Sequence, residues 1–530
     1  MNQCCDRRDF AKAGLVAAAA GGMGLLAGSA KADEASAARP GAPERWDAEA
    51  DAVIIGYGPA GATAAIDLAD AGLTSVLLEK MDREHAGGDC AVCGGYILVG
   101  GDRTVDQYIV STLNGVSREF AEVAVARLNA APDYMRGLGI EIGTDMPVVA
   151  AAEGEPRGQA LYHGFEAAVD QRADKITVMY ETPGVALIQD PLTKEVLGVK
   201  AGSADAPIYV KANRGVVVAS GSYEADREMT NRIHMAGLLF PTVGSPANTG
   251  DGLKMLLEAG CKAQNFSKAL EYDAMAVRVP SDEVGTALTL TSYPNGSSFI
   301  FVNREGKRFM DETATLQHSK NDYVFQYNEF IGQNRSDQEH TGYPNSPAFM
   351  VFDQAMLEAG PIVNVNGGGM GWNIFGLYTW SENNEAEVEN GWIVKADTLE
   401  ELAQKCSGKD MWGNDVSVDP AGLVASVEEF NAACEAGEDT ALNRSSGAMA
   451  PIGDGPYYAI EVIPATLYAT GGATHDINAQ AVNWSDQPIP RLYLAGLVGD
   501  PFTVHSTAVA GCVAWARVAA EQISQLEAWA

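Results

Sequence analysis

The residues best suited to chemistry begin with three glycines that follow an apolar segment. Residues 51–55 read Asp-Ala-Val-Ile-Ile, and Gly56-x-Gly58-x-x-Gly61 and an alanine-rich segment come next. This order predicts a strand, a tight turn and a helix whose first N–H groups face a pyrophosphate. Glu79 ends a second apolar segment, where its carboxylate can accept hydrogen bonds from ribose hydroxyls. Together these residues predict a dinucleotide site.

A second set of candidates for chemistry lies toward the C-terminus. The Tyr468 hydroxyl is our first choice as a hydrogen-bond donor or acid to a substrate carbonyl, with the Gly472 amide as an oxyanion-type partner. His505 titrates near neutral pH and can act as acid, base or carbonyl ligand. The alternatives are a packed aromatic at Tyr468 and a structural histidine at His505.

Further glycine-rich segments favour FAD over NAD as the dinucleotide. Residues 86–95, Ala-Gly-Gly-Asp-Cys-Ala-Val-Cys-Gly-Gly, can lie flat along an extended cofactor. An apolar segment ends at Ser220, Asn248 to Gly252 opens a helix, and another apolar segment ends at Gly496. The cofactor-binding residues that we predict are Gly56, Gly58, Ala60, Gly61, Glu79, Lys80, Gly87, Gly88, Gly94, Gly95, Ala186, Ser220, Gly221, Asp251, Gly496, Val509 and Ala510.

Taken together, these segments resemble the flavoprotein family of soluble fumarate reductases, urocanate reductases and 3-ketosteroid Δ1-dehydrogenases. The resemblance runs from Asp51 to the C-terminus. It implies an α/β fold, in which a Rossmann-like FAD-binding domain is made of two chain segments and an α+β capping domain is inserted between them. We place the first segment at 48–265, the cap at 266–445 and the return segment at 446–530. The substrate is then expected between cap and flavin, where closure excludes water.

The segment 295–312 is similar to the family's stretch before its acid/base residue, but that residue is changed here. Four positions after Glu312, fumarate reductases have an arginine and ketosteroid dehydrogenases a tyrosine, whereas this chain has Leu316, which cannot transfer a proton. Asn295 stands where the family has its second proton-path arginine. His318 lies nearby and is either a substitute or a surface histidine.

The segment before the return to the FAD-binding domain also departs from the family. Fumarate reductases read His-His-Thr-Met-Gly-Gly where this chain reads Leu-Tyr-Ala-Thr-Gly-Gly at 467–472. The pocket is thereby less cationic, which favours a neutral or bulky substrate over a small dicarboxylate. Leu497 follows Gly496 where many family members have a glutamate that binds the ribityl chain.

These observations predict an FAD-dependent oxidoreductase acting on CH–CH groups, and we favour reduction of a C=C bond conjugated to a carbonyl. The resemblance implies hydride transfer from flavin N5 to the β-carbon, with protonation by a side chain such as Tyr468 or His505. Desaturation uses the same geometry. One alternative is a 3-ketosteroid dehydrogenase or steroid reductase acting on a bulky neutral enone. Another is a non-catalytic electron-transfer or redox-sensing flavoprotein that uses Cys90 and Cys93.

The composition of the chain argues against some classes of binding partner. The 530 residues include 70 acidic and 36 basic side chains, a net charge of −34 that argues against binding to nucleic acid or anionic membranes. No second CxxC follows Cys90 and Cys93, so no metal site is expected.

The acidic surface suits docking of an external electron donor such as a basic c-type cytochrome. Flavin reduction by such a donor should then depend on ionic strength, and insensitivity would contradict this docking.

The N-terminus is typical of an export signal. Arg7 and Arg8 precede an Ala- and Gly-rich apolar segment at 13–28, and Ala30-Lys31-Ala32 is a cleavage candidate. This pattern indicates a twin-arginine signal at 1–32, followed by a flexible leader at 33–47. We therefore expect a periplasmic or other extracytoplasmic protein with no membrane span once the signal is removed.

Overall fold

The structure is a computed structural model that describes most of the chain between residues 39 and 529. Leu316, His318, Asn295 and His505, and the predicted signal at 1–32, lie outside the described residues. Within 39–529, the residues that are not described are 98–103, 113–114, 145–146, 235–240, 267–270, 279–286, 290–295, 313–334, 337–340, 343–344, 346, 364–377, 410–414, 470 and 500–507.

An eight-stranded, mostly parallel sheet forms the first half of the fold. Its strands follow the order β19 (Gln480–Val482), β20 (Pro488–Leu494), β6 (Pro207–Val218), β1 (Ala48–Ile55), β2 (Ser75–Leu78) and β3 (Ile176–Met179), and the hairpin of β4 (Gly184–Gln189) and β5 (Val196–Gly202) joins β6. The strands from β20 to β3 run parallel. Because both faces of a parallel sheet are covered, the central strands are nearly continuous apolar runs, as in β2, where every residue is buried.

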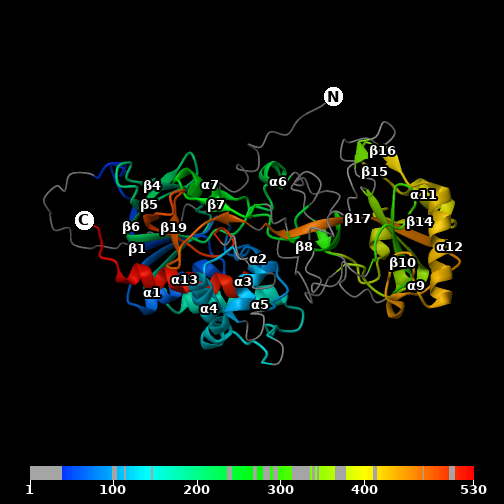
Figure 1. The fold of residues 1–530 in the computed structure, drawn as a ribbon, viewed down its shortest axis with the longest axis horizontal. Coiled ribbons are helices and arrows are strands. Elements are labelled where there is room, and N and C mark those ends of the chain that lie inside the picture. The colour runs from blue at the N-terminus through cyan, green and yellow to red at the C-terminus, as the bar shows by residue number, and fades with distance from the viewer. Residues whose placement is uncertain are drawn as a thin grey trace. The chain divides into compact units, whose positions relative to one another are not determined.

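Helices pack on both faces of this sheet. On one side lie α1 (Pro59–Asp70), α4 (Arg118–Gly137), α5 (Arg157–Asp170) and the C-terminal α13 (Ala508–Gln525), as Figure 1 shows. The alanine-rich α1 packs against α13, and Ile54, Ile66 and Trp515 are buried in their shared core. On the other side, α7 (Asp251–Glu258) packs against β4. The first and last parts of the chain therefore build one hydrophobic core.

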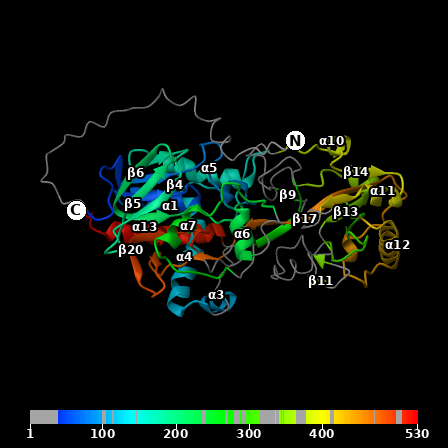
Figure 2. The same ribbon diagram turned by 90° about the horizontal axis from the view of Figure 1, so that it is seen from above.

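A second, antiparallel sheet contains β10 (Phe299–Asn303), β13 (Ala348–Asp353), β17 (Tyr457–Tyr468), β8 (Glu271–Arg278) and β9 (Ala287–Thr289), with β14 (Val394–Ala396) paired to β17. Residues 457–462 of β17 pair with β13, and the rest of the strand pairs with β8 (Figure 2). The helices α11 (Leu399–Lys405) and α12 (Pro420–Ala436) contribute to its core. The predicted start of the return segment at 446 lies before β17, and the domain boundaries stay predictions.

The remaining elements are short and lie in connections. They are α2 (Asp89–Val92), α3 (Val105–Ser111), α6 (Arg227–His234), β7 (Ala263–Gln264), β11 (Arg335–Ser336), β12 (Thr341–Gly342), α9 (Gln354–Glu358), α10 (Glu385–Glu389), β15 (Ser407–Lys409), β16 (Asp415–Ser417), a 3-10 turn at Ser446–Ala448 and β18 (Gly472–Ala473). None of the helices within the described ranges has the length and apolar character needed to cross a membrane.

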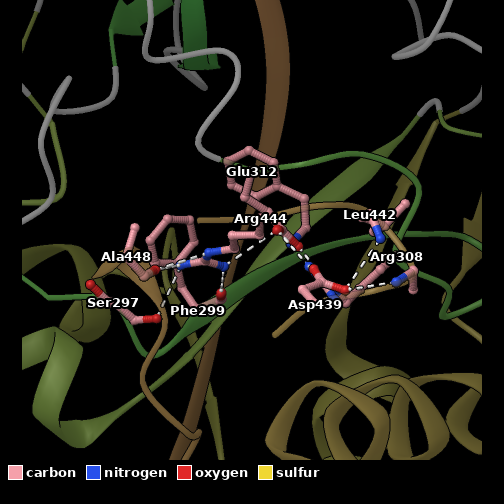
Figure 3. Close-up of polar contacts among 10 residues, drawn as sticks. Ser297, Phe299, Arg308, Glu312, Asp439, Leu442, Arg444 and Ala448 are labelled. Carbon is pink, nitrogen blue, oxygen red and sulfur yellow. Dashed lines mark hydrogen bonds and ion pairs between the residues drawn. The ribbon is translucent and has the colours of Figure 1, made fainter. Parts of the chain in front are cut away.

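Buried charges join two distant stretches of chain beside the second sheet (Figure 3). The Arg308 guanidinium donates to both carboxylate oxygens of Glu312 at 2.8 Å and to Asp439 at 2.8 Å. Arg444 Nη1 donates to the same Glu312 at 3.3 Å. The side chains of Glu312 and Arg444 are fully buried, and buried charges persist only when they are paired in this way.

Backbone carbonyls take the remaining donors of Arg444. Its nitrogens donate to the carbonyl of Phe299 at 2.6 Å, that of Ser297 at 3.1 Å and that of Ala448 at 2.8 Å, and these groups surround the guanidinium in Figure 3. Arg308 and Arg444 therefore hold residues 297–312 to residues 439–448. Both arginines are occupied by protein groups.

Candidate cofactor and substrate site

The carboxyl ends of four parallel strands meet at one edge of the first sheet. Ile55 at the end of β1 is in register with Leu78 of β2 and with Val218 of β6, and Val218 is in register with Leu494 of β20. The residues that follow these strands include the predicted cofactor residues Gly56, Glu79, Ser220 and Gly496. Ligands of open α/β sheets bind at this edge, so the topology brings these four positions together where a dinucleotide is expected.

The glycine motif at this edge leaves room for a ligand and none for side chains inside the turn. A Cβ added at Gly61 would lie 1.9 Å from the Gly56 carbonyl oxygen, so the helix and the turn touch through backbone alone. A Cβ added at Gly58 would have one described neighbour within 4 Å, the Gly87 carbonyl oxygen at 3.7 Å. No side chain of the described residues caps the start of α1. Its first N–H groups can therefore face a pyrophosphate.

Glu79 lies buried at the end of β2. Its carboxylate accepts hydrogen bonds from the Tyr57 amide at 2.9 Å and the Met81 amide at 2.8 Å. Burial raises the pKa of this carboxyl, and the two amide bonds act in the opposite direction. The amides fix the orientation of the side chain, and each oxygen keeps a second lone pair for a ribose hydroxyl.

Lys80 and Asp251 were predicted separately, and the structure brings them together. Lys80 Nζ donates to Thr249 Oγ1 at 2.8 Å and to Asp251 Oδ2 at 2.9 Å. This contact joins the end of β2 to the first turn of α7. The two side chains thus fix the loop 249–251 beside Glu79.

The glycine-rich segment 86–95 does not lie flat as expected, because the short helix α2 interrupts it. Gly87 and Gly88 have positive φ angles, and the chain then turns into the helix. A Cβ added at Gly158 of α5 would lie 2.5 Å from the Cys90 carbonyl oxygen, so α2 packs directly on the α5 backbone. Gly87 remains at the dinucleotide turn opposite Gly58, whereas Gly94 and Gly95 follow the helix.

Ser220 and Gly221 follow β6 at the same edge. The Ser220 hydroxyl is buried and has no hydrogen-bond partner among the described residues, which is the state expected of a group that binds a cofactor. Gly221 has φ +74°, and a Cβ there would lie 2.7 Å from Asn248 Oδ1. With the open glycine turn, this orphaned hydroxyl indicates that the residues present fit FAD.

The return segment and β4 also contribute residues near the glycine turn between β1 and α1. A Cβ added at Gly496 would lie 3.2 Å from the Ala60 Cβ atom, so the loop after β20 contacts the start of α1. Val509 and Ala510 lie in the first turn of α13. Ala186 lies in β4 near Gly184, whose added Cβ would be 2.9 Å from Ile55 Cγ2. Direct contact of these residues with the cofactor stays a prediction.

Tyr468 is the last residue of β17 and is 5% exposed. Its hydroxyl is buried and has no partner among the described residues. Leaving such a group unsatisfied costs about 1–3 kcal/mol, and a ligand carbonyl would remove this cost. Gly472 lies in β18, paired with Gln264 of β7. The catalytic roles of Tyr468 and Gly472 remain predictions, and His505 lies outside the described residues.

The sequence interpretation missed two acids that meet beside this site, Asp89 and Glu224. Glu224 is 3% exposed and accepts hydrogen bonds from Asn248 Nδ2 at 2.7 Å and from the Ser222 hydroxyl. Asp89 Oδ1 accepts from the Ser245 amide at 2.7 Å. Burial raises the pKa of Glu224 to about 7. Burial, together with the charge of Glu224, raises the pKa of Asp89 well above its ordinary value.

Comparison with known proteins decides the family. Residues 51–503 match the family model described as FAD binding domain. The chain belongs to the FAD binding domain family. Family membership confirms FAD as the cofactor, the predicted α/β fold with a capping domain, and an FAD-dependent oxidoreductase.

Relatives of this FAD-binding protein include a reductase and steroid dehydrogenases. A digoxin reductase of Eggerthella lenta is 28% identical, and the match covers 99% of this chain and 97% of that protein. A 3-oxosteroid 1-dehydrogenase of Mycolicibacterium smegmatis is 28% identical over 58% of this chain and 50% of its own length. The 3-ketosteroid delta1-dehydrogenase of Sterolibacterium denitrificans has the same fold, with TM-score 0.67, 20% identity, and coverage of 90% of this chain and 99% of that one. The resemblance to fumarate reductases and ketosteroid dehydrogenases is confirmed.

Proposed function

We propose that this FAD-dependent oxidoreductase reduces a C=C bond conjugated to a carbonyl, in a bulky and neutral enone. The observation that carries the proposal is the buried Tyr468 hydroxyl without a described partner. Bound FAD supplies hydride transfer to carbon. Tyr468 donates its hydroxyl hydrogen to the carbonyl oxygen of the substrate, which draws electron density from the β-carbon. Its closed surroundings exclude water from this hydrogen bond.

Charge supports a neutral substrate. Leu467 and Tyr468 stand where the related fumarate reductases have histidines. Arg308 and Arg444, the buried arginines beside the second sheet, are occupied by Glu312, Asp439 and backbone carbonyls. A small dicarboxylate needs cationic partners when it leaves water, because an unpaired buried charge is strongly disfavoured. The solved steroid dehydrogenase relative holds 1,4-androstadiene-3,17-dione, which is a neutral ketone.

A 3-ketosteroid dehydrogenase or steroid reductase is the second candidate. The observation that favours it is the likeness of fold to that steroid-bound structure over 90% of this chain. A 3-ketosteroid dehydrogenase shares the polarised carbonyl with the proposed reductase and differs from it in the direction of electron flow, whereas a steroid reductase shares both and differs only in its steroid substrate. Saturated and unsaturated ketones assayed with an electron acceptor and an electron donor, respectively, distinguish them.

The experiment is an anaerobic panel of substrates with the FAD-loaded protein and reduced methyl viologen. We expect kcat/KM for a bulky neutral enone to exceed that for fumarate by at least about tenfold, a difference of about 1.4 kcal/mol in transition-state binding. Urocanate and acrylate serve as matched anionic controls. Fastest turnover of fumarate would contradict the neutral pocket, and turnover of no compound would favour an electron-transfer or redox-sensing protein.

We also propose that the chain is exported by the twin-arginine route and receives electrons from an external donor, such as a basic c-type cytochrome. Arg7 and Arg8 before the apolar segment support export, and the net charge of −34 supports docking of a basic donor. Replacing both arginines by lysine should strongly reduce the amount of protein outside the cytoplasm in cell fractionation. Unchanged export of this variant would refute the route.

A further inference from the structure

Two acids from distant parts of the chain meet beside the proposed site. Asp89 is the first residue of α2, and Glu224 lies in the loop that follows β6. The loop that contains Ser245 and Asn248 holds both acids, because the Ser245 amide donates to Asp89 and Asn248 Nδ2 donates to Glu224, each at 2.7 Å. The charge of Glu224 raises the pKa of Asp89. Glu224 receives three donors, Asn248 Nδ2, the Ser222 hydroxyl, and the Ala469 amide at 3.4 Å.

Within the described part of the chain, one buried oxygen of this pair receives no hydrogen bond. Asp89 Oδ1 accepts from the Ser245 amide, but Asp89 Oδ2 is buried and no described group donates to it. A buried acceptor of this kind needs a donor, and a proton held between the two carboxyl groups provides one. The Asp89–Glu224 pair therefore holds at least one proton.

The charges of the surrounding groups also indicate that the Asp89–Glu224 pair holds at least one proton. Among the ion pairs of the described residues, none includes Asp89 or Glu224. Among the residues that the structure describes, the titratable groups that face the pair are Cys90, Cys93 and Tyr223, which are neutral or anionic and cannot offset a carboxylate. Two buried carboxylates without a cation cannot both stay ionised.

The pair lies between the cofactor side and the substrate side of the site. Asp89 directly follows Gly88, and Gly87 faces the dinucleotide turn at Gly58. On the other side, the Ala469 amide that contacts Glu224 belongs to the residue after Tyr468. A bound cofactor that receives two electrons gains negative charge, and the pair lies beside the turn that would hold this cofactor. A proton taken up nearby lowers the energy of the reduced state.

We propose that the Asp89–Glu224 pair is a proton store. It takes up one proton from solvent when bound FAD receives two electrons from an external reductant, and it returns that proton when substrate is reduced. The pair thereby changes from one shared proton and a charge of −1 to two protons and no charge, and back. The second half of the cycle rests on the proposed function, whereas the first half needs FAD and a reductant alone.

The pH dependence follows from the pair's own titration. Below about pH 5 both carboxyl groups are already protonated, so reduction adds no proton to the pair. Above about pH 7, Glu224 is ionised in the oxidised protein, because its pKa is about 7. Charge added to the cofactor raises that pKa, and uptake follows. The excess uptake is therefore present at about pH 8 and absent at about pH 5.

The test measures proton uptake by the holoenzyme without substrate. Reduced methyl viologen, which carries no proton, is added anaerobically in weak buffer with a pH indicator. At about pH 8 we expect the natural protein to take up about one proton per flavin more than Asp89→Asn or Glu224→Gln. Protons taken up by the flavin ring itself are common to all three. Asp226→Asn is the matched control, because this acid lies two residues after Glu224 but pairs with Lys254 at 2.7 Å.

Equal proton uptake by the natural protein, Asp89→Asn and Glu224→Gln at about pH 8 would overturn the proposal. So would an excess in the natural protein that is unchanged at about pH 5. If one variant fails to bind FAD, the other variant and the two pH values for the natural protein still decide. Because no substrate is present, failure here leaves the enone assay unaffected, and failure of the enone assay leaves proton uptake unaffected.

Discussion

Replacing Tyr468 by phenylalanine should lower kcat for reduction of a neutral enone by at least about 100-fold. Removal of a positioned acid or hydrogen-bond donor typically costs this much or more. The hydroxyl of Tyr468 is buried and has no described protein partner, so its loss leaves no orphaned group and should not destabilise the fold. FAD content should stay at the level of the natural protein.

The measurement is anaerobic steady-state turnover with reduced viologen, together with flavin absorbance per protein. Tyr458→Phe is the matched control, since Tyr458 belongs to the same strand but its hydroxyl donates to Gln354 Oε1 in the second sheet region. Tyr458→Phe should keep its kcat. Full activity of Tyr468→Phe would instead make Tyr468 a packed aromatic that lines the pocket.

Replacing Gly61 by valine should yield protein without FAD. The new Cβ would lie 1.9 Å from the Gly56 carbonyl oxygen, and these are backbone atoms at the junction of β1 and α1. The helix must move away from the strand, which displaces the N–H groups that face the pyrophosphate. Activity should fall below detection because the cofactor is absent.

Flavin absorbance after purification and after incubation with added FAD checks this expectation. Gly137→Ala serves as control, because Gly137 is a helical glycine near the end of α4 and a Cβ there meets no atom within 4 Å. It should bind FAD like the natural protein. Stoichiometric FAD in Gly61→Val would show that the turn tolerates the displacement.

The fold and the cofactor were predictable because their signals are local. The strand, glycine turn, helix and acid at 51–79 follow one another directly, and each residue type has one geometric reason to be there. The break of the glycine segment by α2 was not predictable in the same way. It depends on α5, whose Gly158 lets Cys90 and its neighbours pack on the helix backbone.

The candidate site was predictable only in part, for a related reason. Lys80 and Asp251 were predicted one by one, but their ion pair joins residues that only the sheet brings together. The Asp89–Glu224 pair gave no signal, because each acid alone reads as an ordinary loop or turn residue. Proton sharing is a property of the contact between them.

The strand β17 connects the second sheet to Tyr468. It pairs with β13 and β14 along residues 457–462, pairs with β8 beyond them, and ends at Tyr468, directly before the amide that contacts Glu224. The pairing with β8 shifts register between Ala465 and Thr466 and again between Thr466 and Tyr468. Because such irregularities bend a strand, Tyr468 lies beyond a bend that separates it from the regular part of β17 in the second sheet.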